Sequence, residues 1–226
     1  MLFRSPENKA KSVEAMFDRI SGKYDRMNRL LTFRLDVAWR KAAVREIEGA
    51  PNALVIDLAC GTGDMCNDLH AAGYTALGFD FSMGMLCNAS TTAPLTRADV
   101  LQLPLPDSCV DAVTCGFALR NFTGIEPFFA ECARVLRPGG RLVVLDAGEP
   151  KSKILRFGHS LYFRKLVPFI GGLLSDRAAY SYLPASTAYL PEPHVVNNLI
   201  RTAGFRAVVH RRFGFGAIHR FVGTRT

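Results

Sequence analysis

Apolar runs of five or six residues mark the strands in the central part of the chain. The run from Ala53 to Leu58 is continuous rather than alternating, which indicates a parallel strand that is covered on both faces. Similar runs predict strands at Tyr74 to Phe79, Val110 to Cys115 and Arg141 to Asp146, and a short strand at Leu95 to Ala98. Helical segments separate these strands, and this alternation is typical of an α/β fold with a parallel sheet.

The segments between and after these strands carry helix and hairpin signals. Asp64 to Ala72 is predicted to form the first crossover helix, and Ile125 to Leu136 has apolar residues at helical spacing. A further helix is predicted from His194 to Ala203. Two strand-like runs follow it, at Phe205 to Arg212 and Phe215 to Val222, and they predict a C-terminal antiparallel hairpin.

The first 49 residues lie in front of this unit and predict a helical cap. We expect residues 1 to 11 to be a loose tail and Ser12 to begin a short helix that ends at Ile20. Asp36 is a good N-cap for a second helix that runs to Gly49. Helices in this position are suited to cover a substrate.

The turn after the first strand carries the clearest chemical signal. Gly61 and Gly63 permit a tight turn in which the backbone approaches a ligand without a side chain in between. A dinucleotide fingerprint requires a third glycine three residues after Gly63, but Cys66 stands there. Asp80 ends the second strand, where a carboxylate can accept both hydroxyls of a ribose. Capping of the following helix is the alternative role for Asp80.

Five segments together resemble one enzyme family. They are YDRMNRLLTF from Tyr24, WRK from Trp39, DLACGTGD from Asp57, GFALRNF from Gly116 and RVLRPGGRLVVLD from Arg134. From about Met16 to His219, the chain resembles the ubiquinone/menaquinone biosynthesis C-methyltransferases, which are class I S-adenosylmethionine (AdoMet) methyltransferases. The resemblance implies an α/β fold: a Rossmann-like seven-stranded methyltransferase sheet with helices on both faces and an antiparallel C-terminal hairpin.

The resemblance also implies a single class I methyltransferase domain over residues 1–226. We expect this domain to consist of an N-terminal helical cap (1–49), a cofactor-binding core (50–150), a substrate lid insertion (151–190) and a C-terminal helix and hairpin (191–226). AdoMet is the expected methyl donor.

Several residues of the matched motifs are expected to hold AdoMet. Asp99 and Val100 fall where the family contacts adenine, and Arg40 could receive the cofactor carboxylate bidentately. A turn-forming role for Asp99 and a helix-surface position for Arg40 are the alternatives. The expected cofactor-binding residues are Tyr24, Arg40, Asp57, Gly61, Thr62, Gly63, Asp80, Asp99, Val100 and Gly116.

The L-R-N segment is the expected centre of catalysis. C-methylation of a hydroquinone ring requires a phenolate, and an unperturbed phenol has a pKa near ~10. Arg120 is a poor proton acceptor but a good donor to a developing oxyanion, so that water would carry the proton away. A salt bridge near the strand end is the alternative role for Arg120. The expected catalytic residues are Arg120, Asn121 and Tyr24, and none of the five histidines is expected to be the base.

The resemblance implies a prenylated quinol such as demethylmenaquinol as the acceptor. Two departures from the family pattern concern the acceptor side: Asp146-Ala147-Gly148 after the fifth strand, and Arg212 to Gly216 in the hairpin. A methyltransferase for another lipophilic phenol or specialised metabolite therefore stays open. A non-catalytic binding subunit is a third reading, against which the intact glycines argue.

Charge adds a candidate partner. The net charge is +8, but residues 51–150 carry eleven acidic and five basic side chains, so the excess of cations lies in the flanks. An acidic centre suits a cationic sulfonium, and basic flanks suit an anionic membrane surface rather than nucleic acid. Lys151 to Leu174 combines five cations with large apolar residues, which is typical of a membrane-surface helix or a lid.

Other features of the sequence concern localisation, metal binding and oligomeric state. The N-terminus lacks the apolar segment of a secretory signal and the chain lacks a 20-residue apolar run, so we expect a cytoplasmic protein, peripheral on the inner face of the membrane where it meets its acceptor. The six cysteines include no C-x-x-C pair, so no metal site is expected. A homodimer stays open.

Overall fold

A computed structural model describes residues 6–148, 150, 152, 157, 161–162, 167, 176, 179, 182 and 186–226. In this part of the chain one sheet runs in the order β3-β2-β1-β4-β5-β7-β6. Its strands are β1 (Leu54–Leu58), β2 (Thr75–Asp80), β3 (Leu95–Arg97), β4 (Val110–Gly116), β5 (Leu136–Ala147), β6 (Phe205–Phe213) and β7 (Ile218–Arg225). The five strands predicted for the central region are all present.

The C-terminal hairpin is antiparallel, as predicted. β7 pairs antiparallel with both β5 and β6, whereas β1 to β5 pair in parallel. The predicted start of the last strand at Phe215 is wrong, because β7 begins at Ile218. Phe215 has a φ of 57° and lies in the turn η5 (Gly214–Gly216), a left-handed conformation that cannot continue a strand.

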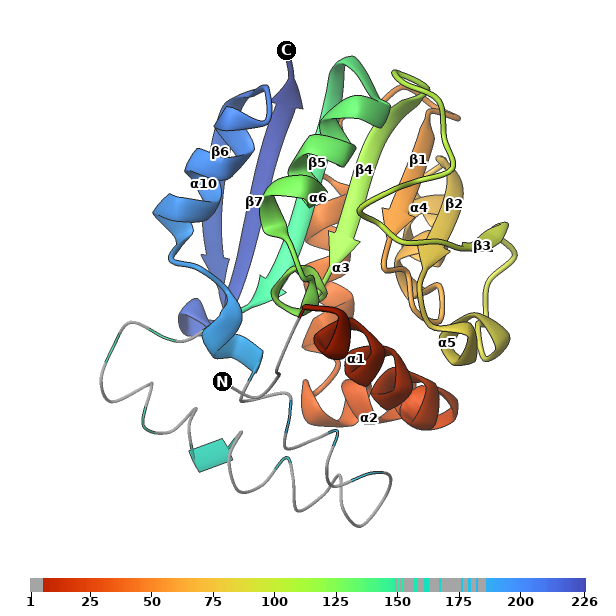
Figure 1. Cartoon of the computed structure of the whole chain (residues 1–226), viewed down its shortest axis with the longest axis vertical. Helices are drawn as coiled ribbons and strands as arrows, with labels where there is room; N and C mark the ends of the chain where they lie inside the picture. Colours follow the sequence, from red (N-terminus) through yellow and green to blue (C-terminus); the bar gives the residue numbers. More distant parts are fainter. Residues whose placement is uncertain are drawn as a thin grey trace.

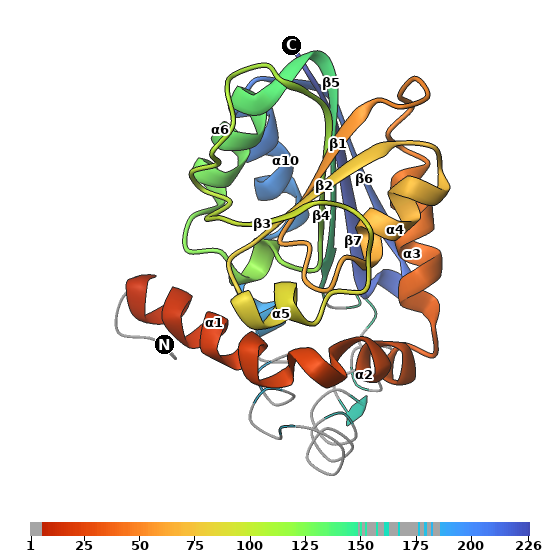
Figure 2. The same ribbon diagram turned by 90° about the vertical axis from the view of Figure 1, so that its right-hand side faces the viewer.

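Two pairs of helices cover the two faces of the sheet (Figures 1 and 2). On one face α6 (Ile125–Val135) and α10 (Pro193–Thr202) pack on a core that includes Val144. On the other face α3 (Leu35–Val44) and α4 (Asp64–Ala71) pack on a core that includes Val143. Successive residues of β5 thus point to opposite cores, which explains the continuous apolar run in its sequence.

The N-terminal helices lie across the carboxyl edge of the sheet (Figure 2). They are α1 (Pro6–Ile20), the short η1 (Ser21–Lys23) and α2 (Tyr24–Leu31). The prediction of a loose tail to residue 11 is wrong, because helix α1 begins at Pro6. Proline suits the first helical turn, where its missing N–H would have no partner.

The predicted boundaries of the next helix are also wrong. α3 begins at Leu35 after Arg34, which has a φ of 63°, and it ends at Val44 rather than Gly49. Asp36 therefore lies in the first turn and is not the N-cap. Its carboxylate accepts a hydrogen bond from Thr32 Oγ1 at 2.6 Å and pairs with Arg40.

The predicted lid over residues 151–190 lies largely outside the described residues. The basic stretch Lys151 to Leu174 is described only at positions 152, 157, 161–162 and 167. In the described part of the chain, no helix combines the length and the apolar composition that crossing a membrane requires.

Candidate functional site

A cavity lies at the carboxyl ends of β1, β2 and β4, with α1 as its opposite wall. Seven of the predicted site residues line it: Tyr24, Gly61, Asp80, Asp99, Val100, Gly116 and Asn121. Helix α1 contributes Ala10, Val13, Glu14 and Phe17, none of which the sequence pattern identified. Ligand sites at this edge are general in open α/β sheets.

The two glycines of the first turn serve different purposes. Both have positive φ, 57° at Gly61 and 87° at Gly63. A Cβ at Gly61 would meet no atom within 4 Å, so the backbone there faces open space in the cavity wall. A Cβ at Gly63 would come within 2.4 Å of Thr91 Cγ2. Gly61 thus leaves room for a ligand, whereas Gly63 permits close packing within the protein.

Asp80 is held in place by backbone amides. Its carboxylate accepts hydrogen bonds from the N–H of Gly61 at 2.7 Å and of Ser82 at 2.8 Å. Burial raises the pKa of Asp80, while these N–H donors lower it. The N-cap of helix α5 (Met83–Cys87) is Ser82, whose hydroxyl accepts from the Met85 N–H at 3.1 Å. Asp80 is therefore oriented toward the cavity rather than used as a cap.

Asp57 and Asp99 differ in their access to the cavity. Asp57 is buried below the cavity floor and accepts a hydrogen bond from Thr114 Oγ1 at 2.7 Å. Burial raises its pKa to about 7, although the hydrogen bond lowers it in part. Asp99 lines the cavity, and its Oδ1 also accepts from the Leu101 N–H at 2.9 Å. Asp99 thus stabilises a turn and faces the cavity at the same time.

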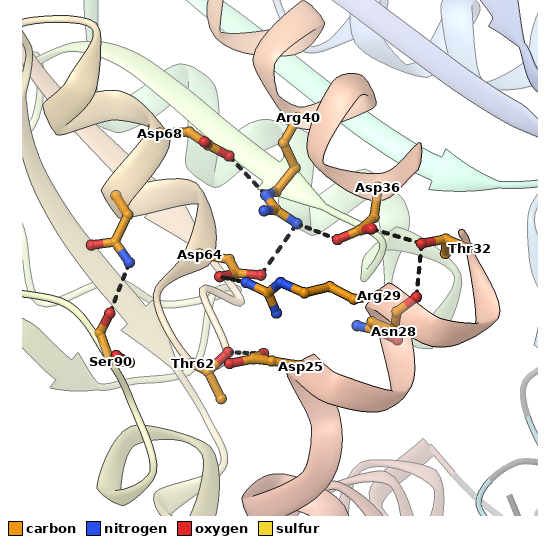
Figure 3. A network of polar contacts seen from close by, with 11 residues as sticks. Asp25, Asn28, Arg29, Thr32, Asp36, Arg40, Thr62, Asp64, Asp68 and Ser90 are labelled. Atoms are coloured by element: carbon orange, nitrogen blue, oxygen red, sulfur yellow. Dashed lines mark hydrogen bonds and ion pairs between the residues drawn. The ribbon is translucent and has the colours of Figure 1, made fainter. Parts of the chain in front are cut away.

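Arg40 does not line the cavity. Figure 3 shows its guanidinium surrounded by carboxylates, with Asp36 and Asp68 at 2.8 Å and Asp64 at 3.2 Å. Burial lowers the pKa of Arg40, but these carboxylates outweigh it and leave the pKa raised. The spacing of these residues in the sequence is a signal for the pairing. Asp36 and Arg40 stand one helical turn apart, as do Asp64 and Asp68.

The same network joins α2 to the glycine turn (Figure 3). Thr62 Oγ1 donates to Asp25 Oδ1 at 2.6 Å, and Arg29 pairs with Asp64 at 2.8 Å. Burial raises the pKa of Asp25, and the hydrogen bond from Thr62 opposes this. Thr62 is thereby turned toward the N-terminal helices and does not line the cavity.

Arg120 is buried and does not itself line the cavity, although its neighbours Ala118 and Asn121 do. Its Nη1 donates to the Phe117 carbonyl and pairs with Asp146, and its Nε donates to Ser186 Oγ at 3.0 Å. Nη2 is the remaining nitrogen, and the described part of the chain supplies no acceptor for it. Both predicted roles of Arg120 are therefore sterically compatible: the salt bridge is formed, and one pair of N–H donors is left over.

Two tyrosines stand near Arg120. Tyr182 donates to Asn121 Oδ1 at 3.2 Å, and burial raises its pKa to about 12. Burial also raises the pKa of Tyr24, whose hydroxyl bonds Asn28. Both phenols are therefore hydrogen-bond groups rather than bases near neutral pH.

Helix α1 is joined to the cavity rim at three points. Lys9 Nζ donates to the carbonyls of Arg120 at 3.2 Å and Phe122 at 2.8 Å. Glu14 pairs with Arg97 at 2.8 Å. Asp18 Oδ1 accepts from the Ser82 hydroxyl, and from the Gly84 N–H at 2.8 Å.

The sequence has close relatives among methyltransferases. The model of the ubiE/COQ5 methyltransferase family matches residues 5–225. The demethylmenaquinone methyltransferase of Thermus thermophilus is 41% identical over 222 residues, which cover 93% of this chain and 100% of the relative. The ubiquinone/menaquinone biosynthesis C-methyltransferase UbiE of Syntrophotalea carbinolica is 39% identical, over 93% of each chain.

Solved structures confirm the fold. A SAM-dependent methyltransferase from Thermotoga maritima superimposes with a TM-score of 0.66 at 18% identity, over 94% of this chain and 99% of that chain. Phosphoethanolamine N-methyltransferase 2 of Haemonchus contortus, in complex with S-adenosyl-L-methionine, gives a TM-score of 0.62 at 13% identity, over 83% of this chain and 52% of that chain. At these identities the similarity establishes the Rossmann-like methyltransferase fold.

Proposed function

Because the chain belongs to the ubiE/COQ5 methyltransferase family, we propose that it methylates a ring carbon of a prenylated quinol such as demethylmenaquinol. The protein is an AdoMet-dependent methyltransferase. The observation that carries the choice of acceptor is the identity of 38 and 41% to two demethylmenaquinone methyltransferases over at least 92% of their lengths.

The cavity fits the methyl donor. AdoMet, when bound, supplies an electrophilic methyl group on a sulfonium. Asp80, fixed by two backbone N–H groups, is placed to accept the ribose hydroxyls, and the open space at Gly61 lets the backbone approach the ligand. We assign Asp99, Val100 and Gly116 to the remaining cofactor wall because they line the same cavity.

Three predicted cofactor residues are assigned supporting roles. Arg40 pairs with three carboxylates, so we propose that it fixes α3 to α4 instead of binding the cofactor carboxylate. Thr62 links the turn to Asp25, and Asp57 is the buried acceptor of the Thr114 hydroxyl at the end of β1. Tyr24 lines the cavity and is kept as a contact of the cofactor or the acceptor.

Arg120 is assigned to the acceptor. Asp146 and the Phe117 carbonyl hold Nη1, so the guanidinium has a fixed orientation before a ligand arrives. We assign Nη2 to the phenolate oxygen that develops when the quinol loses its proton to water. A fixed donor stabilises developing charge without reorganisation during the reaction. Asn121 lines the cavity and is 7% exposed. We assign it to hold either the ring of the acceptor or the loop that carries Arg120.

The alternative acceptor, another lipophilic phenol, is supported by Gly148. A Cβ at this position would lie 2.7 Å from His219 Nε2, so a larger residue fits at this departure from the family pattern only if His219 shifts. This difference changes the shape of the acceptor side and leaves the methyl-donor side unaltered.

The test is transfer of a labelled methyl group from AdoMet into reduced demethylmenaquinone, against a panel of phenols without a prenyl tail. We expect the prenylated quinol to have the highest kcat/KM. Methylation of a panel phenol with demethylmenaquinol left unmodified would establish the alternative.

The acceptor also determines where the enzyme works. A quinol with an isoprenoid tail partitions into the bilayer, so we place the enzyme at the inner membrane surface as a peripheral protein. A homodimer stays a prediction.

A further inference from the structure

Four large apolar side chains are exposed on two turns at the carboxyl edge of the sheet, the edge that also holds the cavity. At the junction of α2 and α3, Phe33 in the turn is 75% exposed, Leu30 at the end of α2 is 50% exposed and Leu35 at the start of α3 is 49% exposed. In the turn from β6 to β7, Phe215 is 84% exposed. We call these four residues the apolar tip. Exposed apolar groups that gather in one place mark interaction sites, whereas scattered ones do not.

Both phenylalanines of the apolar tip have left-handed backbone conformations. Phe33 has a φ of 53° and Phe215 a φ of 57°. This conformation costs a bulky residue roughly 1–2 kcal/mol, and asparagine or glycine would adopt it more easily. Folding stability alone therefore favours other residues at both positions. Strain at an exposed aromatic residue points to a function outside the folded core.

The two turns belong to one surface. Leu35 and Trp39 stand one turn apart on α3, and a Cβ at Gly214 would lie 3.3 Å from Trp39 Cζ2. The β6–β7 turn therefore packs on the same helix whose start carries Leu35. On the other side, the Phe33 ring lies 6.4 Å from that of Tyr162, whose hydroxyl donates to the Leu31 carbonyl at 2.6 Å.

The charged side chains of the stretch 21–45, which contains the α2–α3 turn, differ in exposure according to their sign. Two acids lie in the stretch 21–45, and both face inward: Asp25 accepts from Thr62, and Asp36 pairs with Arg40. The exposed charged residues of this stretch are all cations. Lys23, Arg26 and Arg34 stand near the α2–α3 turn, whereas Lys41 and Arg45 follow farther along α3.

We propose that the apolar tip inserts into the surface of an anionic lipid bilayer, with Lys23, Arg26 and Arg34 against the head groups. The proposal rests on the proposed function, in which the acceptor resides in the bilayer, and it names the surface that meets the lipid. Two turns that expose aromatic and leucine side chains, with exposed cations beside the α2–α3 turn, offer both attractions of interfacial binding, apolar insertion and charge.

The test replaces both phenylalanines with asparagine. Phe33→Asn together with Phe215→Asn removes two apolar rings, and asparagine tolerates the left-handed backbone, so the variant should fold at least as stably as the parent. The measurement is co-sedimentation with vesicles of phosphatidylglycerol and phosphatidylcholine that contain no quinol. We expect the partition coefficient to fall about tenfold or more, because each ring loses a buried apolar contact. Affinity for AdoMet should stay unchanged.

A matched control is available on α10. Val195 is 38% exposed on a helix of the α6 face, so Val195→Gln removes exposed apolar surface elsewhere and should leave partitioning unaltered. Raising the salt concentration should weaken binding of the parent, because the cationic contribution is screened.

Three outcomes would overturn the proposal. Equal partitioning of the parent and the double variant would show that the tip does not insert. An equal loss in Val195→Gln would show that lipid binding is unspecific. A change in oligomeric state with unchanged partitioning would assign the tip to contact between two copies of the chain. The vesicles contain no quinol, so lipid binding is measured independently of methylation. If the enzyme failed to methylate demethylmenaquinol, the proposed function would be wrong but the vesicle result would still hold.

Discussion

The two walls of the cavity are held together by different interactions. The strand wall consists of the ends of β1, β2 and β4, where Asp80 is fixed by the backbone N–H groups of Gly61 and Ser82 in the loops that follow β1 and β2. The helical wall consists of α1, which is joined to the rim by the side chains of Lys9, Glu14 and Asp18. We therefore expect the strand wall to be part of the cooperative fold, whereas the helical wall can loosen separately.

The largest effect is expected at the acceptor end of the strand wall. Arg120→Met should lower turnover by about 10²–10³ while leaving AdoMet affinity nearly unchanged, because it removes a donor to charge that develops during the reaction. Asp146 is fully buried, so the single variant would leave a carboxylate without its partner. Losing one member of a buried pair costs about 3–5 kcal/mol of folding stability.

The double variant Arg120→Met with Asp146→Asn keeps this test interpretable, since the asparagine is neutral and can still accept from the Ala147 N–H. Asp146→Asn alone is the matched control. Single-turnover rates and AdoMet calorimetry are the measurements. A folded double variant that turns over like the control would assign phenolate stabilisation to other groups.

The next effect concerns the cofactor end of the strand wall. Asp80→Asn should weaken AdoMet binding by about 10²-fold, since hydrogen bonds to a charged group contribute about 1.5–3 kcal/mol each. Calorimetry on the folded variant checks this. Asp111→Asn is the control, because Asp111 also accepts from a backbone N–H, that of Leu54 at 2.8 Å, but does not line the cavity. Equal affinities of the two variants would contradict the assignment of Asp80.

A smaller effect is expected from the helical wall. Asp18→Asn weakens the contacts to Ser82 and Gly84, which stand beside Asp80, and should lower AdoMet affinity about tenfold because charge-assisted hydrogen bonds become neutral ones. Lys9→Met is the matched variant, since Lys9 holds the carbonyls of Arg120 and Phe122. Lys9→Met should lower kcat and change the affinity for AdoMet by less than about twofold. If both variants changed the same parameter, α1 would act as one rigid unit.

The contrast between the walls also explains what the sequence could predict. The strand wall was predictable because its signals are local: an apolar run, a glycine turn and an acid at a strand end. The helical wall was not, because Lys9 and Asp18 contact residues 64 or more positions away. No spacing rule identifies such contacts. Arg40 is an intermediate case. Its motif was recognised in the sequence, but its structural role depends on Asp64 and Asp68 of α4, which the motif does not include.

The last effect concerns folding stability rather than activity, and it is a pH dependence that comes from Asp57 in the strand wall. Burial raises its pKa from 3.8 to about 7 in the folded protein, so between these values the folded state binds more protons than the unfolded chain. Stability should therefore fall as pH rises from about 4 to 7, with a slope from this group of at most ~1.4 kcal/mol per pH unit. Asp57→Asn should remove that slope from urea unfolding measured at several pH values. Thr114→Val deletes the hydrogen bond that lowers the pKa, so it should extend the slope to higher pH. Parallel curves for the parent and Asp57→Asn would mean that Asp57 stays charged in the folded protein.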